Sequence, residues 1–235
     1  MRLNQFIAES GMCSRREADR LIAAGEVTVN GAVAALGQQV SPGDRVSVSG
    51  RDIAPESERI FILVNKPLGV TSTTDRSDRN NIIDFVGHPK RLFTIGRLDR
   101  DSTGALLLTN DGNIVNRLLR SENELGKTYI VHTDKNITPD FLAKMAGGVK
   151  IYNPVTNSYV VTKPCEIRQV SAKSFEIILT QGYNRQIRRM CTALEYRVLS
   201  LNRTRFLFLS VEGLKAGAFR SLTPEEIKKL DEVTT

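Results

Sequence analysis

The chain lacks tryptophan and has only two histidines and three cysteines among its 235 residues. Cys13, Cys165 and Cys191 are scattered and form no Cys-x-x-Cys pair, which argues against a disulfide framework or a zinc site and indicates a reducing compartment. His88 and His132 are too few for a histidine triad or a metal cluster, and we interpret both as surface or loop residues. Any chemistry must therefore come from other side chains.

Long hydrophobic runs are also missing. The longest, such as Ile60 to Val64, are far too short to cross a bilayer. The first residues, Met1 to Asn4, turn polar at once and contain no signal-peptide core, so we expect a cytoplasmic protein without membrane contact. A hydrophobic content of 40% is enough to bury a core, and the length allows one large or two unequal domains.

Acidic residues are outnumbered, and the net charge of +7 is unevenly spread. Residues 181–205 hold six arginines against the single Glu195. Arginine is suited to bidentate contact with phosphate, so this segment indicates a polyanionic partner. A solvated basic helix face is the alternative that charge alone leaves open.

Residues 1–50 have the pattern of a small module of two helices and a hairpin. Apolar residues at helical spacing start at Leu3, and Ser10-Gly11 ends that first helix. Ser14 to Glu17 is a capping box that opens the second helix. Asn30-Gly31 then predicts a two-residue hairpin turn.

This order of elements resembles the S4 RNA-binding domain. On the second helix Arg16 and Arg20 fall opposite the apolar stripe, one turn apart, and face solvent or a ligand together. We expect Arg15, Arg16 and Arg20 to contact RNA, with a purely structural role for the module as the alternative.

The stretch of residues 51–59 is polar, contains Pro55 and predicts a linker. Longer elements follow from residue 60, interspersed irregularly with helices. They predict an α+β fold with a mixed sheet rather than a regularly alternating, doubly wound one. The expected strands are residues 60–64, 127–131, 175–179 and 201–209.

The segment from Gly96 to Gly104 places Asp99 between Arg97 and Arg100. Opposite charges within a few Å favour the ionised carboxylate, which can act as a nucleophile or a base. For the tripeptide Arg-Leu-Asp by itself, a turn or helix-cap aspartate is the simpler interpretation. A catalytic role therefore needs an RNA-binding surface and a partner for Asp99 elsewhere in the chain.

A helix after Gly182 supplies a candidate partner. Its apolar stripe consists of Ile187, Met190, Cys191 and Leu194, so Cys191 is expected in the core. Arg188 sits on the border of the stripe, from which it can turn into an adjoining cleft. We therefore expect Arg188 to be the partly buried partner of Asp99, because an unpaired carboxylate in a cleft is costly.

Four strings, together with the S4-like module, carry a resemblance over essentially the whole chain. They are NKPLGV (residues 65–70), GRLDRDSTGALLLTNDG (96–112), GKTYIV (126–131) and QGYNRQIRRMC (181–191). In order and spacing they resemble the RsuA-type RNA pseudouridine synthases, and within them the RluF-like branch that modifies large-subunit (23S) ribosomal RNA.

The resemblance implies an isomerase that converts uridine to pseudouridine after flipping the nucleotide into a pocket. It implies an S4-like domain over residues 1–50 and a catalytic domain over residues 60–235 with a mixed, mainly antiparallel sheet flanked by helices. The reaction changes neither oxidation state nor composition, so no cofactor or metal is expected. We expect a monomer whose partner is ribosomal RNA, with transfer RNA or small-subunit ribosomal RNA as alternative substrates.

By position, the resemblance assigns catalysis to Asp99, Tyr129 and Arg188. Tyr129 would stack on the base and help to remove the proton from carbon 5; a core aromatic is the alternative. For Asn65 and Lys66 a role in the turn is the alternative to RNA contact. The expected RNA-binding residues, besides those of the S4-like module, are Asn65, Lys66, Arg97, Arg100, Lys127, Asn184, Arg185, Arg189, Arg203 and Arg205.

Three competing functions are weaker. A non-catalytic RNA-binding protein would use Asp99 only structurally. A metal-binding Asp-x-Asp pair at Asp99 and Asp101, as in a nucleotidyl or glycosyl transferase, would place arginines where they repel a cation. A methyltransferase with an S4-like module would need a strand that runs into a G-x-G-x-x-G loop, and the sequence has none.

Overall fold

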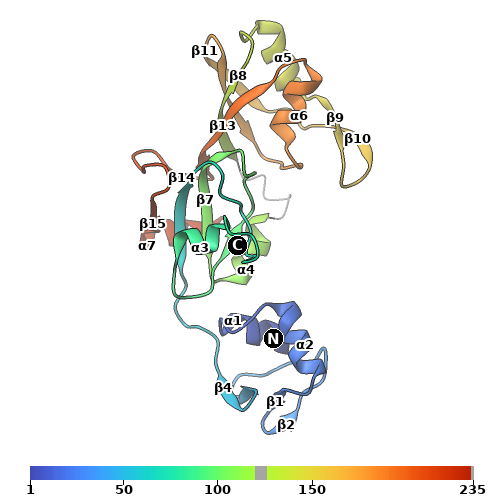
Figure 1. Cartoon of the computed structure of the whole chain (residues 1–235), viewed down its shortest axis with the longest axis vertical. Coiled ribbons are helices and arrows are strands. Elements are labelled where there is room, and N and C mark those ends of the chain that lie inside the picture. The colour runs from blue at the N-terminus through green and yellow to red at the C-terminus, as the bar shows by residue number, and fades with distance from the viewer. Residues whose placement is uncertain (120–125, 234–235) are drawn as a thin grey trace. The chain divides into compact units, whose positions relative to one another are not determined.

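The computed structural model describes residues 1–119 and 126–233, apart from the side chains of residues 116 and 119 (Figure 1). The chain divides into two compact units. Unit 1 comprises Met1–Ile60, His88–Leu92 and Thr109–Gly112, and unit 2 comprises Phe61–Gly87, Phe93–Leu108 and Asn113–Thr235.

Unit 1 packs two helices on a four-stranded sheet of order β2-β1-β3-β4. The Ser14 side chain accepts a hydrogen bond from the Glu17 N–H and so caps the second helix where the sequence predicts it. Leu3, Ile7 and Ile22 are buried in the core of this unit. The elements are α1 (Leu3–Glu9), α2 (Arg15–Ala23), β1 (Val27–Val29), β2 (Ala32–Val33), β3 (Val46–Val48) and β4 (Arg51–Ile53).

The turn of the first hairpin is as predicted, because Asn30 and Gly31 both have positive φ angles, 53° and 84°. The predicted linker is wrong for its first three residues. Arg51–Ile53 forms β4 and pairs antiparallel with β3, with Val46 opposite Ile53. The segment is polar because β4 is an edge strand with exposed side chains, and polarity alone did not distinguish it from a linker.

Unit 2 is built around a nine-stranded mixed sheet with the order β11-β12-β8-β13-β7-β5-β15, to which β14 and β6 add by pairing with β13 and β7. Strands β13 and β7 run parallel, whereas β8 pairs antiparallel with both β12 and β13. The predicted α+β class with a mixed sheet is confirmed. The strands are β5 (Phe61–Lys66), β6 (Phe93–Ile95), β7 (Thr103–Thr109), β8 (Lys127–Thr133), β11 (Glu166–Ser171), β12 (Ser174–Leu179), β13 (Val198–Phe206), β14 (Leu209–Ser210) and β15 (Phe219–Ser221).

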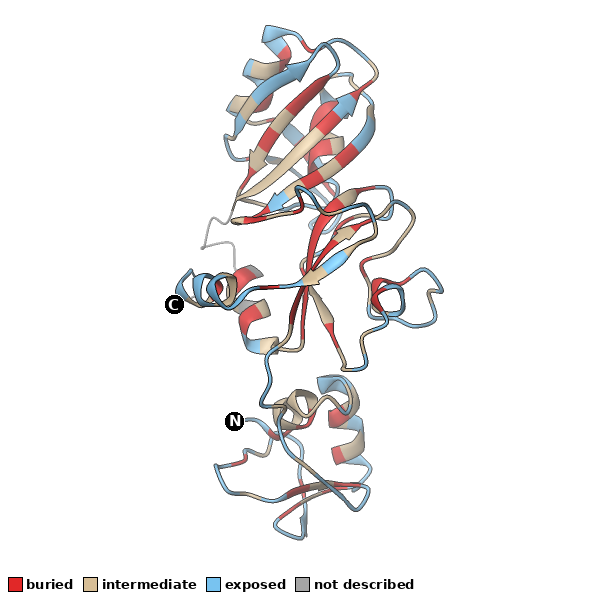
Figure 2. Cartoon of the chain, turned by 90° about the vertical axis from the view of Figure 1, so that its left-hand side faces the viewer, coloured by how far each residue is buried: buried red, intermediate tan, exposed pale blue. Residues whose placement is uncertain are grey.

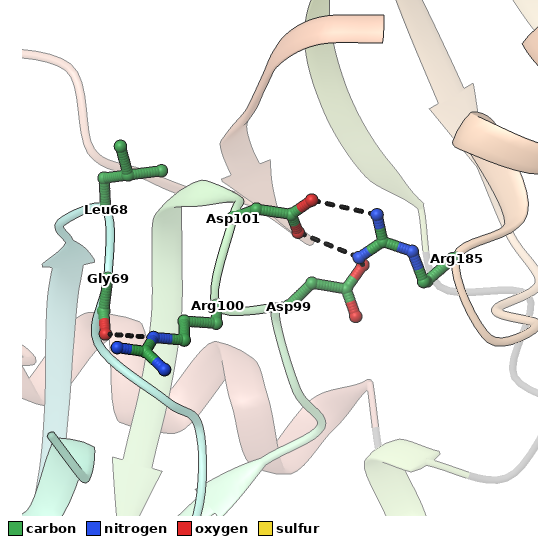
Figure 3. A pocket seen from close by; sticks show the side chains of 6 residues that line it. All are labelled: Leu68, Gly69, Asp99, Arg100, Asp101 and Arg185. Atoms are coloured by element: carbon green, nitrogen blue, oxygen red, sulfur yellow. Dashed lines mark hydrogen bonds and ion pairs between the residues drawn. The ribbon is translucent and has the colours of Figure 1, made fainter. Parts of the chain in front are cut away.

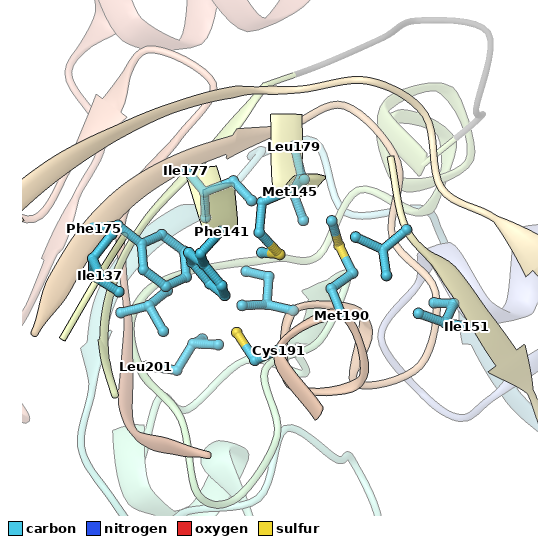
Figure 4. Close-up of a cluster of buried hydrophobic side chains, with 13 residues drawn as sticks. Ile137, Phe141, Met145, Ile151, Phe175, Ile177, Leu179, Met190, Cys191 and Leu201 are labelled. Atoms are coloured by element: carbon cyan, nitrogen blue, oxygen red, sulfur yellow. The ribbon is translucent and has the colours of Figure 1, made fainter. Parts of the chain in front are cut away.

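Helices and a separate hairpin cover this sheet, and two buried clusters fill the space between the layers. One cluster joins α5, α6 and β9 to β8, β12 and β13 (Figure 4). The other joins α4 and α7 to β5, β7 and β14. Buried residues follow the strands of the sheet in Figure 2. The remaining elements are α3 (Ile82–Val86), α4 (Gly112–Leu119), α5 (Pro139–Gly147), β9 (Lys150–Asn153), β10 (Ser158–Val161), α6 (Gln186–Ala193) and α7 (Pro224–Glu232).

The predicted strand at residues 201–209 differs from the structure at both ends. Strand β13 starts at Val198, and it stops at Phe206 because Leu207 adopts a positive φ of 56°. The chain turns back there, and β14 pairs with β13 through Phe206 and Leu209. Within the described residues, no helix is long and apolar enough to cross a bilayer.

Candidate active site

Asp99 lies in the loop that connects β6 to β7. The Ser72 hydroxyl donates to the Leu98 carbonyl at 2.9 Å and accepts from the Leu98 N–H at 3.1 Å. The Gly69 N–H donates to the Arg100 carbonyl at 2.9 Å, and Arg100 Nε donates to the Gly69 carbonyl at 3.1 Å. These bonds tie the loop to the segment after β5, so the backbone that presents Asp99 is fixed.

Lys66, the last residue of β5, stabilises the turn beside this loop. It is fully buried, and its Nζ donates to the carbonyls of Pro67 and Val70 at 3.0 and 2.7 Å. Burial lowers the pKa of Lys66 to about 8, although the carboxylates of Asp101 and Asp99 oppose the shift. The buried ammonium group of Lys66 therefore stabilises the turn at residues 67–70, beside the loop that carries Asp99.

Arg185 supplies the positive charge beside Asp99. Its Nη1 lies 3.5 Å from Asp99 Oδ2, and its two Nη atoms donate to the two carboxylate oxygens of Asp101 at 2.9 Å each (Figure 3). Arg185 is the N-cap of α6 and has a left-handed backbone, with φ 51° and ψ 36°. Non-glycine residues rarely adopt this conformation, and it is common at functional sites.

The prediction that Arg188 pairs with Asp99 is wrong, because Arg188 contacts Asp101 instead. Its Nη2 donates to the Asp101 carbonyl at 2.8 Å and lies 3.3 Å from Asp101 Oδ2, while Nη1 donates to the Val198 carbonyl at 3.3 Å. The helical position did predict its burial, since only 14% of the side chain is exposed. Asp99 is reached by Arg185, one turn earlier, because the left-handed cap breaks the helical pattern on which the prediction depended.

Asp101 is the second carboxylate of the site. Hydrogen bonds from Arg185 hold its pKa below the ordinary value, and the charges of Arg188 and Arg185 act in the same direction against partial burial. The loop thus carries two carboxylates with different surroundings. Among the described residues, Asp101 is engaged by two arginines, whereas Asp99 has one ion-pair contact and 35% of its side chain exposed.

Two cavities meet at Asp99 and Arg100. The first has a volume of about 450 Å³ and is lined by Leu68, Gly69, Asp99, Arg100, Asp101 and Arg185 (Figure 3). The second, of about 380 Å³, is lined by Thr71, Ser72, Thr73, Asp75, Asp78, Arg97, Leu98, Asp99 and Arg100. Volumes of this size are typical of small-ligand sites. The carboxylate of Asp99 is thus available to a bound group, beside two arginines.

Other predicted site residues lie outside the lining of both cavities. Tyr129 is half-buried on β8 and packs against the cluster formed with α5 and α6. Lys127 lies on the same strand, and burial lowers its pKa. The Asn65 side chain donates to the Leu214 carbonyl at 2.7 Å, which is a structural contact.

The predicted RNA-binding residues divide into exposed and buried ones. Arg189 is half-buried. Its Nε donates to the backbone carbonyl of Asn184 at 3.0 Å, and its Nη2 donates to the Asn184 Oδ1 at 3.3 Å. Two predictions of RNA contact are wrong for the described structure: Lys66 and Arg203 are buried, and Arg203 donates from Nε to the Ala105 carbonyl at 2.7 Å. Among the arginines predicted to contact RNA, the exposed ones are Arg97, Arg100, Arg185 and Arg205 in unit 2 and Arg15, Arg16 and Arg20 in unit 1.

Sequence reasoning missed the contribution of Asp101 and Leu68 to the site. Asp101 stands two residues after Asp99, and the sequence led us to consider it only as a metal ligand. Leu68 is an exposed apolar side chain on the wall of the first cavity. The signal for Leu68 was its place inside the NKPLGV string, between Lys66 and Gly69.

Comparison with known proteins identifies both parts of the chain. Residues 60–193 match the family described as RNA pseudouridylate synthase, and residues 1–46 match the S4 domain. The dual-specificity RNA pseudouridine synthase RluF of Salmonella typhi is 48% identical over 228 residues, which cover 96% of this chain and 77% of the relative. The ribosomal large subunit pseudouridine synthase B of Bacillus subtilis is 37% identical over 97% of this chain and 95% of its own.

The fold has a solved counterpart of the same kind. A crystal structure of a pseudouridylate synthase superposes with a TM-score of 0.70 at 29% sequence identity and covers 98% of this chain and 99% of that chain. Fold and site together define an RNA-modifying enzyme with an attached RNA-binding domain. The chain belongs to the RNA pseudouridylate synthase family, in its RsuA-type branch with an S4 domain, and the resemblance drawn from the motifs is confirmed. It is an RNA pseudouridine synthase, which isomerises uridine to pseudouridine.

Proposed function

We propose that this enzyme modifies a uridine of large-subunit ribosomal RNA in the cytoplasm and that Asp99 is its catalytic residue. The observation that carries the assignment is the position of Asp99: half-buried, 3.5 Å from the Arg185 guanidinium and exposed to two cavities. In this division of labour residues 60–235 perform catalysis, and residues 1–50 contribute RNA contacts.

The substrate nucleotide must leave its stack to reach Asp99, at a cost of a few kcal/mol. Arg97 and Arg100 are exposed on the cavity walls, and phosphate contacts from such arginines offset that cost. The apolar side chain of Leu68 on the wall of the first cavity offers a surface for the flipped uracil or its ribose.

An ionised Asp99 beside the ribose has two routes. In the first, a carboxylate oxygen attacks carbon 1′, the N-glycosidic bond breaks and uracil leaves with the bonding electrons; after rotation, carbon 5 attacks carbon 1′ and expels the carboxylate. In the second, Asp99 removes the 2′ proton as uracil leaves, which forms a glycal, and returns that proton when carbon 5 adds. Both routes end with removal of the proton from carbon 5 and protonation of the nitrogen released from the sugar.

Tyr129 is our candidate for a group that stacks on the base and assists removal of the carbon 5 proton. On the sheet it stands opposite Arg203, which in turn stands opposite Gly104, five residues after Asp99. Two strand spacings amount to about 10 Å. The register therefore brings Tyr129 to the part of the sheet where the Asp99 loop enters β7.

The proposed substrate follows from the relatives. The Bacillus subtilis relative is described as a large-subunit enzyme, and the Salmonella typhi relative as one of dual specificity. Large-subunit ribosomal RNA is thus our first choice, and transfer RNA is the second substrate that a dual specificity would admit.

The experiment is to map pseudouridines in ribosomal and transfer RNA from cells with and without the gene. We expect the loss of a position in large-subunit ribosomal RNA, restored by the wild-type gene and by Asp140→Asn, a matched change at an exposed aspartate of α5. Asp99→Asn should not restore it. Restoration by Asp99→Asn would overturn the catalytic assignment, and an unchanged large-subunit map would overturn the substrate.

A further inference from the structure

The hairpin of β9 and β10 has an outer face that the active site does not use. Lys150, Tyr152, Tyr159 and Val161 are exposed on it, and the register places Tyr159 opposite Tyr152 and Val161 opposite Lys150. Tyr159 has 68% of its surface exposed. A cross-strand aromatic pair can stabilise a hairpin by itself, but a contiguous exposed aromatic patch also marks a candidate binding surface.

The chemistry of this face suits nucleic acid. The two tyrosine rings lie 5.6 Å apart in an edge-to-face arrangement, and the Tyr152 hydroxyl bonds to the Asn157 side chain. Lys150 Nζ lies 5.3 Å from the centre of the Tyr159 ring. Residues 148–165 contain two lysines and no acidic residue. Rings combined with cations are the elements with which proteins hold unpaired bases and their phosphates.

The inner face of the hairpin connects it to the active site. Ile151 is buried in the same cluster as Met190 of α6 (Figure 4). Helix α6 packs against β9, and its N-cap is Arg185, which lies beside Asp99. Helix α6 thus connects the hairpin that carries the exposed tyrosines to the residue beside Asp99.

We propose that the outer face of the β9–β10 hairpin binds unpaired bases of the RNA substrate, which stack on Tyr159 and Tyr152 while Lys150 contacts a phosphate. The proposal requires RNA as the substrate class and is independent of which uridine is modified. Stacking is tolerant of base identity because every base has a π-face, so this surface adds affinity for single-stranded RNA rather than sequence specificity. A second copy of this chain is the alternative occupant.

The test measures the affinity of the full-length protein for a 12-nucleotide oligoadenylate and for an RNA duplex, at several salt concentrations. Tyr159→Ala should weaken oligoadenylate binding about tenfold, with the salt dependence retained, because a ring carries no charge. Tyr159→Phe, which keeps the ring, should bind within about twofold of wild type. Lys150→Gln should weaken binding and lower the salt dependence by about one phosphate contact.

Two controls separate stacking from loss of structure. Val155→Ala removes exposed apolar surface at the hairpin tip, where 81% of the residue is exposed, without removing a ring, and should leave binding unchanged. Duplex RNA, whose bases are not free to stack, should bind all tyrosine variants alike. Equal oligoadenylate affinity of wild type and a folded Tyr159→Ala overturns the proposal, as does a change of oligomeric state without a change of RNA affinity. Neither result would bear on Asp99, whose test is pseudouridine formation.

Discussion

At the scale of single residues, the contact between Arg185 and Asp101 decides where positive charge stands next to Asp99. Arg185 has a left-handed backbone that costs energy, and two hydrogen bonds of 2.9 Å to Asp101 hold its guanidinium. Bidentate pairs of this kind fix direction as well as charge. We infer that Asp101 acts through Arg185 as a positioning residue for Asp99.

The first prediction concerns Asp101→Asn. The amide keeps the shape of the side chain and one acceptor but loses the charge that holds Arg185, so we expect pseudouridine formation to fall roughly ten- to hundredfold. The free energy of unfolding should change by less than about 1 kcal/mol, because the pair is exposed. Single-turnover assays and urea titration measure the two effects.

The control is Asp140→Asn, which removes the acidic partner of an exposed ion pair with Lys144 on α5; the Asp140 side chain is 71% exposed, against 47% for Asp101. It should match Asp101→Asn in stability and wild type in activity. If Asp101→Asn turned over at the wild-type rate, the negative charge of Asp101 would not be needed to position Arg185, which would contradict the prediction.

The second prediction concerns Lys66 and pH. Its pKa is about 8 in the native state, against 10.5 for an ordinary lysine. Between these values the unfolded chain keeps a proton that the native state has lost, so Lys66 makes the free energy of unfolding rise with pH. Compared with Lys66→Met, wild type should gain about 2 kcal/mol between pH 7 and pH 9.5. Urea titrations of both proteins at the two pH values measure it; a difference that is flat or falls with pH contradicts the assignment.

The sequence predicted which residues of a helix face the core. It did not predict where the long side chains at the start of the helix point. The stripe of Ile187, Met190 and Cys191 is buried as its spacing predicts. The partner of Asp99 was misassigned because Arg185 lies outside the helical backbone, and periodicity says nothing about a left-handed cap. The burial of Arg203 was missed for a similar reason, since strand alternation does not show that β8 and β7 flank β13 on both sides.

At the scale of elements, the parallel pairing of β7 with β13 fixes where the active-site loop ends. Gly104, the second residue of β7, stands opposite Arg203 with a φ of 107°. A Cβ added there would overlap the Arg203 carbonyl and the Asn202 side chain. Only glycine allows the two strands to come this close.

The third prediction follows from that contact. Gly104→Ala should lower the free energy of unfolding by at least about 2 kcal/mol, because both the backbone angle and the space are wrong for a side chain. Gly147→Ala is the control: it lies at the end of α5, where an added Cβ meets nothing within 4 Å. It should be neutral or slightly stabilising. Denaturant titration compares the two, and equal stability of both variants would contradict the strand pairing.

Local signals also determined which elements could be predicted. Strands with apolar runs, such as β5 and β12, and turns with Asn-Gly were recognised. Helix α7 was missed although Thr223 and Glu226 form a capping box at its start. Edge strands such as β4 and β15 are short and polar, and they become strands only through partners distant in the sequence.

At the scale of the whole molecule, the two units differ in how their positively charged side chains are arranged. Unit 1 contributes Arg15, Arg16 and Arg20, exposed on α2, although residues 1–60 hold seven basic and eight acidic residues. We therefore expect the RNA affinity of this unit to depend on the arginines of one helix and not on its net charge.

The fourth prediction tests that helix. Replacing its three arginines by glutamine should lower RNA affinity and reduce the salt dependence by about two to three phosphate contacts, whatever the RNA sequence. The control removes the same charge from exposed lysines elsewhere and should reduce the slope less. An equal effect of both triple variants on binding would mean that only total charge matters. The control lysines are Lys144, Lys173 and Lys228.

The most direct measurement is a single-turnover assay of purified Asp99→Asn with transcribed large-subunit ribosomal RNA, followed by chemical mapping of pseudouridine. We predict that formation falls at least about a thousandfold, while affinity for the same RNA stays within about twofold of wild type. Turnover within tenfold of wild type would contradict the catalytic role of the carboxylate that Arg185 holds in the cleft.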